Sequence, residues 1–383
     1  MNIAFGVRNF RMVGGAERFT LRLAAYLINR GHRLVVYAIK GEPMDGVELR
    51  LVPAPRLCPH YRRAWETGRR IAARLANADA DVTFGEQKIW NAAVVRPGGG
   101  IEATYWEQKL ERRWKSPRLA RLARWLYAKR RYDLRAERLS LLGSATRFII
   151  VNSDLVRRDL VRWYPEAAGR VQVVHNGTPA KVYDPGQAAR QRADFRKAHG
   201  MADSARVALF MGRDFHRKGL ASAIAALAVA DRAEPAADWQ LVVAGRGNPR
   251  PYQSQIAKAG LGGRVRFLGD VAEPALAYAA ADVLLFPSYY DPFANVTVEA
   301  LAEGLPVITT AANGGCEVIR NGCNGWVVDS PLAVERMAEH LAALADAPRL
   351  AAMKRDARAS AEACRLEDRL RDVEQILQAA AGK

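Results

Sequence analysis

The fold is decided by residues 282–310, which read DVLLFPSYYDPFANVTVEALAEGLPVITT. An apolar run that stops at Pro287 is typical of a buried parallel strand. The helical pattern that follows has Asn295 as a candidate N-cap and ends at Gly304, just before Pro306. The strand, helix and second strand expected here are, in order, Asp282–Phe286, Val296–Glu303 and Val307–Thr310. The stretch therefore predicts a β-loop-α-β unit.

Two acids, Asp291 and Glu299, lie in the loop and in the helix of this unit. In open parallel sheets, ligands bind beyond the carboxyl ends of the strands, so both acids can face one pocket. The first amides of the helix, around Thr297, attract an anion such as a phosphate. Two simpler interpretations stay open at this point. Glu299 can be an acid favourably placed in a first helical turn, and Asp291-Pro292 is common in turns.

The remaining composition narrows the class of protein. The chain has 383 residues, enough for two or three domains, and 58 basic against 40 acidic residues give a net charge of +18. That surplus predicts an anionic partner: nucleic acid, anionic lipid or a phosphorylated substrate. We see no run long enough to span a bilayer and no signal peptide, so we expect a cytoplasmic protein. The four cysteines match no zinc or redox motif.

Strands and helices alternate in two separate halves of the chain. The first half opens with a strand at Asn2–Val7, a loop containing Gly14 and Gly15, and a helix from about residue 16 to 29. The paired glycines either let the backbone approach a ligand closely or form only a tight turn. We expect an α/β fold of two Rossmann-like, doubly wound domains that face a cleft. The expected bounds are 1–177, with a C-terminal helix of about 366–383 packed back on it, and 178–365, with Thr178–Arg196 as a linker.

A helical and strongly basic segment runs from Glu102 to Leu142. Between Lys109 and Arg138, twelve basic and three acidic residues give +9, and Ser116-Pro117 predicts a break between two helices. Tryptophan and leucine form two apolar stripes: Trp106, Leu110 and Trp114, then Leu119, Leu122, Trp125 and Leu126. This favours contact with an anionic membrane through about residues 105–139. Two alternatives remain: an amphipathic helix packed on the core, and nucleic-acid binding. Nucleic acid is the less favoured of these, because the tryptophans lie on the apolar stripe and not on a basic surface.

A second loop places two cations at the start of a helix. Arg217, Lys218 and Gly219 follow the strand Val207–Met211, and such a pair suits a diphosphate clamp, although it can also be surface charge. Two further arginines, Arg213 and Arg246, follow glycines at the ends of strands and are candidate donor ligands.

Taken together, these motifs resemble the retaining, nucleotide-sugar-dependent glycosyltransferases of GT-B fold, family 4. The resemblance covers nearly the whole chain and rests on an ordered set of motifs: Gly14 to Arg18, His175-Asn176-Gly177, Phe210 to Arg213, Arg217 to Gly219, Asp291 to Glu299, and Asn321 to Trp326. Within the family, residues 214–219 and the basic helical segment look most like the lipopolysaccharide core glucosyltransferases.

The resemblance implies a role for each candidate site residue. Arg217 and Lys218 would hold the diphosphate, Glu299 the ribose, and Asp291 the donor hexose. The backbone around the helix start would line sugar and phosphate, through Phe293, Ala294, Asn295, Val296 and Thr297. Gly14 and Gly15 would approach the diphosphate from the first domain. Relatives usually have Glu where this chain has Asp291, which puts the donor sugar in doubt. The acid of the first-domain pocket is Glu86 or Glu102.

The same resemblance implies transfer with retention and without a metal ion or other cofactor. The expected donor is UDP-glucose or a close relative, and the expected acceptor is a lipopolysaccharide core or another lipid-linked glycan at the inner face of the cytoplasmic membrane. Two alternatives remain. One is the same fold with UDP-N-acetylglucosamine or a nucleotide-heptose as donor. The other is a non-catalytic binder of anionic glycolipid or nucleic acid that uses the basic segment.

Overall fold

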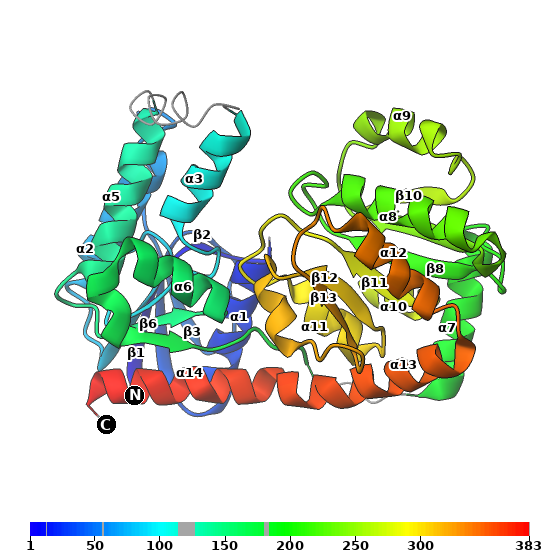
Figure 1. Ribbon diagram of the computed structural model, residues 1–383. Coiled ribbons are helices and arrows are strands. Elements are labelled where there is room, and N and C mark those ends of the chain that lie inside the picture. The colour runs from blue at the N-terminus through cyan, green and yellow to red at the C-terminus, as the bar shows by residue number, and fades with distance from the viewer. Residues whose placement is uncertain (13, 56, 114–126, 180–183, 383) are drawn as a thin grey trace. The chain divides into compact units, whose positions relative to one another are not determined.

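The computed structural model describes residues 1–12, 14–55, 57–113, 127–179 and 184–382 (Figure 1). The chain forms two compact units. The N-terminal unit consists of Met1–Asn176 with Glu367–Lys383, and the C-terminal unit is Gly177–Leu366. Each unit is built on a parallel sheet with helices packed on it, which is the two-domain GT-B architecture expected from the sequence.

The described part of the N-terminal unit holds a seven-stranded sheet in the order β3-β2-β1-β4-β5-β6-β7. Its strands are β1 (Asn2–Phe10), β2 (Arg33–Gly41), β3 (Val47–Leu51), β4 (Val82–Glu86), β5 (Val94–Arg96), β6 (Phe148–Val151) and β7 (Val171–Val173). Its helices are α1 (Gly15–Asn29), α2 (Arg63–Leu75), α3 (Glu102–Arg113), α5 (Ala128–Leu142), α6 (Asp154–Trp163) and α14 (Leu366–Ala381). All neighbouring strands pair in parallel, so β1 and β4 end at the same edge of the sheet.

The last helix, α14, packs on the N-terminal unit although it comes from the other end of the chain (Figure 1). The Glu374 carboxylate accepts hydrogen bonds from the Tyr26 hydroxyl at 2.9 Å and pairs with His32 Nε2 at 2.8 Å. Nearer the end of the helix, Arg147 donates to the carbonyl oxygen of Ala380 at 2.7 Å. Polar contacts thus hold the middle and the end of α14 to this unit.

The described part of the C-terminal unit holds a six-stranded sheet in the order β10-β9-β8-β11-β12-β13. Its strands are β8 (Arg206–Met211), β9 (Trp239–Ala244), β10 (Val265–Gly269), β11 (Val283–Phe286), β12 (Val307–Thr310) and β13 (Gly325–Val328). Its helices are α7 (Pro185–Ala198), α8 (Leu220–Ala233), α9 (Arg250–Lys258), α10 (Pro274–Ala280), α11 (Asn295–Ala302), α12 (Val334–Ala343) and α13 (Ala347–Ala361). The strands β8 to β10 are added toward one edge of the sheet, and β11 to β13 are added toward the other edge. Ligands are therefore expected at the carboxyl ends of β8 and β11, where the two series meet.

Two local expectations were wrong, and a third falls outside the described residues. Residues 185–196 are not a linker but most of α7, because the Asp184 carboxylate caps the helix and Pro185 occupies its first turn. The side chain of Arg196 is then buried, and it donates to Asp282 at 3.0 Å. The N-cap of α11 is Ala294, not Asn295, and it makes no side-chain capping bond. The expected break at Ser116-Pro117 lies outside the described residues.

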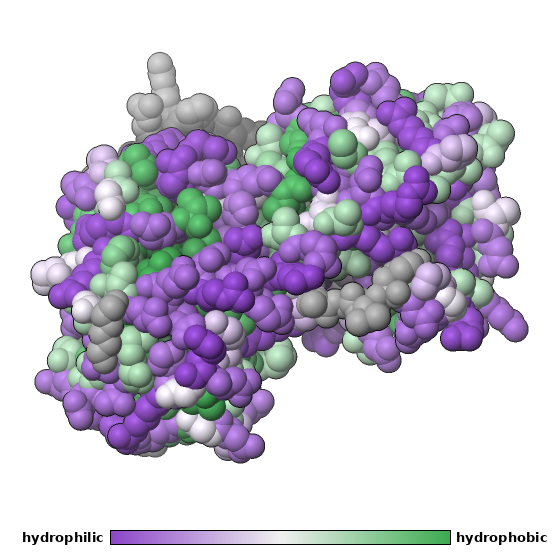
Figure 2. Space-filling view, turned by 90° about the horizontal axis from the view of Figure 1, so that it is seen from below, coloured by the Kyte–Doolittle hydropathy of each residue, from purple (hydrophilic) through white to green (hydrophobic). Residues whose placement is uncertain are grey.

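Figure 2 shows one face of the molecule, on which hydrophilic residues cover most of the surface and hydrophobic residues appear in smaller areas. The large apolar side chains lie instead on the two sheets and under their helices, for example Phe5 and Phe84 in one unit and Phe210 and Phe286 in the other. Among the described residues, no helix has the length and apolar character needed to cross a bilayer.

Candidate active site

In the C-terminal unit, the loop after β8 brings two cations to Asp291, which lies in the loop after β11. The Lys218 ammonium pairs with Asp291 Oδ2, and Arg217 Nη1 lies 3.3 Å from the same oxygen. Arg217 also donates to the Tyr290 carbonyl at 2.8 Å, so its guanidinium is fixed from two directions. The structure therefore joins three of the predicted site residues in one ion cluster at the carboxyl ends of β8 and β11.

This cluster is shielded from solvent. The Asp291 side chain is 9% exposed and that of Lys218 is 13% exposed. Burial acts to raise the pKa of Asp291, but the charges of Lys218 and Arg217 outweigh it and hold that pKa below its ordinary value. The carboxylate is therefore ionised at neutral pH, and it neutralises part of the positive charge that an anionic ligand would meet.

Two glycines make this arrangement possible. Gly219 has φ of +82°, and a Cβ there would lie 1.9 Å from the Pro287 carbonyl oxygen. Gly245 has φ of +120°, and its Cβ would lie 2.1 Å from the Gly212 carbonyl oxygen. A side chain at either position is both strained and blocked. The glycines thus let the loop after β8 lie directly against the ends of its neighbouring strands.

The start of α11 is held by Asn313, a residue that we did not identify from the sequence. Asn313 Oδ1 accepts from the amides of Ala294 at 3.1 Å and Gly315 at 2.9 Å. Its Nδ2 donates to the hydroxyls of Thr297 at 3.0 Å and Thr309 at 3.1 Å. One buried amide side chain thus fixes the backbone at the start of α11, which the resemblance assigns to the ligand. The signal was an Asn before two glycines, at residues 313–315.

The other predicted residues of this unit have different surroundings. Glu299 is half-buried and accepts a hydrogen bond from the Tyr278 hydroxyl at 2.9 Å. Arg246 is exposed and pairs with Asp270 at 2.7 Å. Arg213 is exposed as well. Along the helix start, Phe293, Ala294 and Thr297 are buried, while Asn295 and Val296 are partly exposed.

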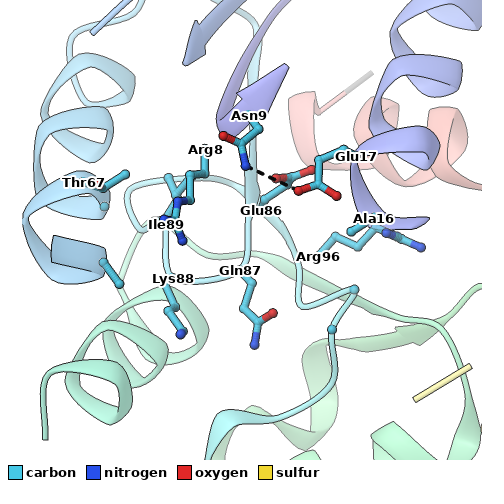
Figure 3. Close-up of a pocket in the computed structure, with 14 residues that line it drawn as sticks. Arg8, Asn9, Ala16, Glu17, Thr67, Glu86, Gln87, Lys88, Ile89 and Arg96 are labelled. Atoms are coloured by element: carbon cyan, nitrogen blue, oxygen red, sulfur yellow. Dashed lines mark hydrogen bonds between the residues drawn. The ribbon is translucent and has the colours of Figure 1, made fainter. Parts of the chain in front are cut away.

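The N-terminal unit contains a separate pocket of about 210 Å³ at the carboxyl ends of β1 and β4 (Figure 3). Figure 3 shows the Asn9 amide donating toward Glu17, close to Glu86. The Thr20 hydroxyl donates to Glu86, and Arg8 lines the same pocket. The predicted glycines lie at the start of α1, with Gly14 as its N-cap and Gly15 as its first residue.

Of the two candidate pocket acids, Glu86 lines this pocket and Glu102 does not. Glu102 pairs instead with Lys88 at 2.6 Å, and Lys88 also contacts Asp133 at 3.1 Å. Burial is the main cause that raises the pKa of Glu86 to about 7, helped by the nearby charge of Glu17. Glu86 is therefore the acid in this pocket that changes its charge near neutral pH.

Comparison with known proteins identifies the two units. Residues 191–361 match the family described as Glycosyl transferases group 1, and residues 13–181 match Glycosyltransferase Family 4. The chain belongs to these glycosyltransferases. The ion cluster lies in the part of the enzyme that matches group 1, and the pocket with Glu86 lies in the part that matches family 4, except for Arg8 and Asn9 before it.

Several known proteins resemble this glycosyltransferase over most of its length. The lipopolysaccharide glucosyltransferase WaaG of Escherichia coli K12 is 28% identical over 348 residues, which cover 89% of this chain and 88% of WaaG. A crystal structure of WaaG matches with a TM-score of 0.80 and 26% identity over 98% of this chain and 99% of that one. A sucrose-phosphate synthase from Thermosynechococcus elongatus, 20% identical with a TM-score of 0.76 over 99% of this chain and 98% of its own, shares the fold.

The expectation that the apolar stripes of the basic segment face a membrane was partly wrong. Trp106 and Leu110 are each only 2% exposed, and Trp106 Nε1 donates to Asp133 at 3.3 Å. These two side chains pack inside the unit and are not available to a lipid surface. The rest of the two stripes, Trp114, Leu119, Leu122, Trp125 and Leu126, lies outside the described residues. Among the residues that are described, no group of three or more His, Cys, Asp or Glu side chains is placed to hold a metal ion.

Proposed function

We propose that this glycosyltransferase transfers a hexose from a UDP-sugar, with retention of configuration, to a lipopolysaccharide core or another lipid-linked glycan. The observation that carries the proposal is the cluster of Arg217, Lys218 and Asp291 beside the N-terminus of α11. Two cations and a helix N-terminus suit a diphosphate, whereas an acid among them suits a neighbouring sugar hydroxyl. The cluster thus combines the two chemistries of a sugar diphosphate.

In this proposal, Arg217, Lys218 and the first amides of α11 stabilise the negative charge that develops on the departing diphosphate. The acceptor hydroxyl attacks from the same side and gives its proton to the leaving phosphate, so the scheme uses neither a protein base nor a metal ion. Glu299 accepts hydrogen bonds from the ribose. Structures of Anabaena HepE with UDP and glucose, 18% identical to this chain with a TM-score of 0.70 over 99% of this chain and all of that one, show the same fold. They lend support to the choice of donor.

Glucose is the first choice of donor sugar because of the similarity to WaaG. Asp291 favours a second candidate, namely UDP-N-acetylglucosamine or a nucleotide-heptose. Its carboxylate is one methylene shorter than that of Glu and is already paired with Lys218 and Arg217. A sugar hydroxyl must share this oxygen with two cations, which changes the geometry that selects the sugar.

The acceptor sugar is assigned to the pocket of the N-terminal unit. Glu86 and Glu17 can accept hydrogen bonds from its hydroxyls, while Arg8 and Lys88 bring positive charge to the same walls. The expected place of action is the cytoplasmic side of the membrane, where a lipid-linked acceptor and a soluble donor meet. The similarity to a lipopolysaccharide glucosyltransferase and the +18 charge support this placement.

The test is to incubate the protein with UDP-glucose, UDP-N-acetylglucosamine and a nucleotide-heptose in turn, together with the deacylated core oligosaccharide of lipopolysaccharide. Transfer should occur from one donor, should survive removal of divalent metal by a chelator, and should be lost in Lys218→Ala. Product anomers identified by NMR report retention or inversion. Vesicle or nucleic-acid binding without transfer from any donor contradicts the proposal.

A further inference from the structure

A group of aromatic side chains lies next to the pocket in the N-terminal unit and has no role in the scheme above. Its members, which we call the aromatic band, are Tyr61, Trp65, Trp90 and Tyr132. The ring centroids of Trp65 and Trp90 are 4.9 Å apart, those of Trp65 and Tyr132 are 6.3 Å apart, and those of Tyr61 and Tyr132 are 6.0 Å apart. All four side chains are partly exposed. The band joins α2, α5 and the segment after β4.

Two exposed arginines lie over these rings. The guanidinium carbon of Arg135 is 4.9 Å from the centre of the Trp65 ring, and that of Arg62 is 5.1 Å from the centre of the Tyr132 ring. Arg62 Nε also donates to the Tyr132 hydroxyl at 2.6 Å. A guanidinium stacked on a ring keeps donors along its edge, which can bind a phosphate or carboxylate in a fixed orientation. The band therefore combines flat apolar faces with positive charge.

The band continues directly from the wall of the pocket. Trp90 follows Lys88 and Ile89 in the chain, and both of these line the pocket. Trp65 lies on α2 next to Ala64, which lines it as well. A Cβ on Gly68, another lining residue, would lie 2.9 Å from the Trp90 ring, so this ring packs against the helix that forms the wall. A chain of sugars that starts in the pocket would reach the Trp65 and Trp90 rings next.

We propose that the aromatic band, with Arg62 and Arg135, is an extended acceptor subsite for an acidic oligosaccharide. This inference rests on the proposed function, because it extends the pocket assigned to the acceptor. The pocket takes the sugar that receives the hexose, and the C–H faces of the following sugars lie on the rings of Trp65 and Trp90. Aromatic side chains with one apolar face and a wet edge suit such a ligand. The arginines bind a phosphate or carboxylate carried by these sugars.

A lipid surface fits the band less well. Side chains that enter a bilayer project from the protein, whereas Trp65 and Trp90 are half-buried and packed against each other. The two rings therefore form a shallow surface and do not project far enough to insert into a bilayer. Such a face, flanked by Arg62 and Arg135, matches a rigid and anionic saccharide.

The test uses the core oligosaccharide that complete deacylation releases from lipopolysaccharide, which keeps its acidic groups and has no acyl chains. Its binding is measured by calorimetry and by quenching of tryptophan fluorescence. Trp65→Ala and Arg135→Ala should each raise its Kd about tenfold, and UDP binding should stay unchanged. Arg135 is exposed, so its replacement tests the band even if Trp65→Ala lowers stability. Removal of the phosphates from the oligosaccharide should weaken binding to the unaltered protein and reduce the effect of Arg135→Ala.

The matched control is Trp163→Ala on α6, which removes another half-buried tryptophan with an arginine, Arg162, 5.2 Å from its ring centre. It should leave the Kd unchanged. Equal Kd values for the unaltered protein, Trp65→Ala and Arg135→Ala overturn the inference. Binding to phosphatidylglycerol vesicles is measured for the same variants. If Trp65→Ala and Arg135→Ala weaken vesicle binding but not oligosaccharide binding, the inference is also overturned, because the band would then face lipid. If the band variants lose the oligosaccharide but no donor supports transfer, the proposed function fails and the subsite stands.

Discussion

Replacement of Asp291 by Asn separates the two roles that this carboxylate can have. Asn keeps the shape and the backbone contacts of Asp291, whose amide donates to the Ala312 carbonyl at 2.9 Å and whose carbonyl accepts from Gly314 at 2.8 Å. It removes the charge that Lys218 and Arg217 share. At 3.3 Å and an effective dielectric constant of about 20, the pair of Arg217 and Asp291 has a gross Coulomb energy of about 5 kcal/mol. Desolvation offsets much of this energy. The net contribution of one charge-assisted hydrogen bond to stability is only about 1.5–3 kcal/mol.

We therefore expect Asp291→Asn to lower the free energy of unfolding by about 3 kcal/mol. We also expect it to bind UDP about tenfold more tightly, because the diphosphate no longer competes with a carboxylate for the two cations. Sugar transfer should fall sharply, since the contact to the donor sugar is altered.

Calorimetric titration with UDP, together with thermal unfolding of each variant, measures both effects. The control is Asp231→Asn, which removes a carboxylate that pairs with Arg264 at 2.6 Å elsewhere in the same unit. UDP affinity that is unchanged or weaker in Asp291→Asn refutes the reasoning. It would mean that the carboxylate does not restrain the cations in solution.

Three further changes have defined outcomes. In the unaltered protein, kcat/KM for the acceptor should rise as the pH increases through about 7, because ionised Glu86 accepts hydrogen bonds from hydroxyls, and Glu86→Gln should remove this step from the pH profile. Asp282→Asn should lower the free energy of unfolding by about 3–5 kcal/mol, because it leaves the buried Arg196 uncompensated, while UDP affinity of the folded protein, followed by calorimetry, stays the same. Gly219→Ala should weaken UDP binding at least tenfold and lower the Tm, because its Cβ would collide with the Pro287 carbonyl; unchanged values would show that the loop can adjust.

The regular elements of the fold were predictable because their signals are local. The apolar runs before Pro287 and after Pro306 are strands, as expected. The helix α7 was missed because Pro185 and Gly186 suggest a loop when they are considered alone. What makes that segment a helix is the capping Asp184 and the burial of its last turn, and the second of these depends on Asp282, far away in the sequence.

For the site, the sequence predicted the residue types but not all of their partners. Arg217, Lys218 and Asp291 meet because two neighbouring strands end together, which the order of strands implies. Asn313 was missed because its local signal, an Asn before two glycines, is equally typical of an ordinary turn. Trp106 was misread because a tryptophan beside arginines looks the same in sequence whether it faces solvent or pairs with Asp133 inside the unit.

The return of α14 to the N-terminal unit decides how the protein can be divided. The chain crosses between the units twice, after Asn176 and after Leu366, so the C-terminal unit is a continuous insert within the N-terminal one. A gene fragment for residues 177–366 is a natural choice for separate expression, whereas a fragment that stops at residue 176 lacks Glu374 and the contacts of α14. A single proteolytic nick at either crossing would leave the two units joined through the other one.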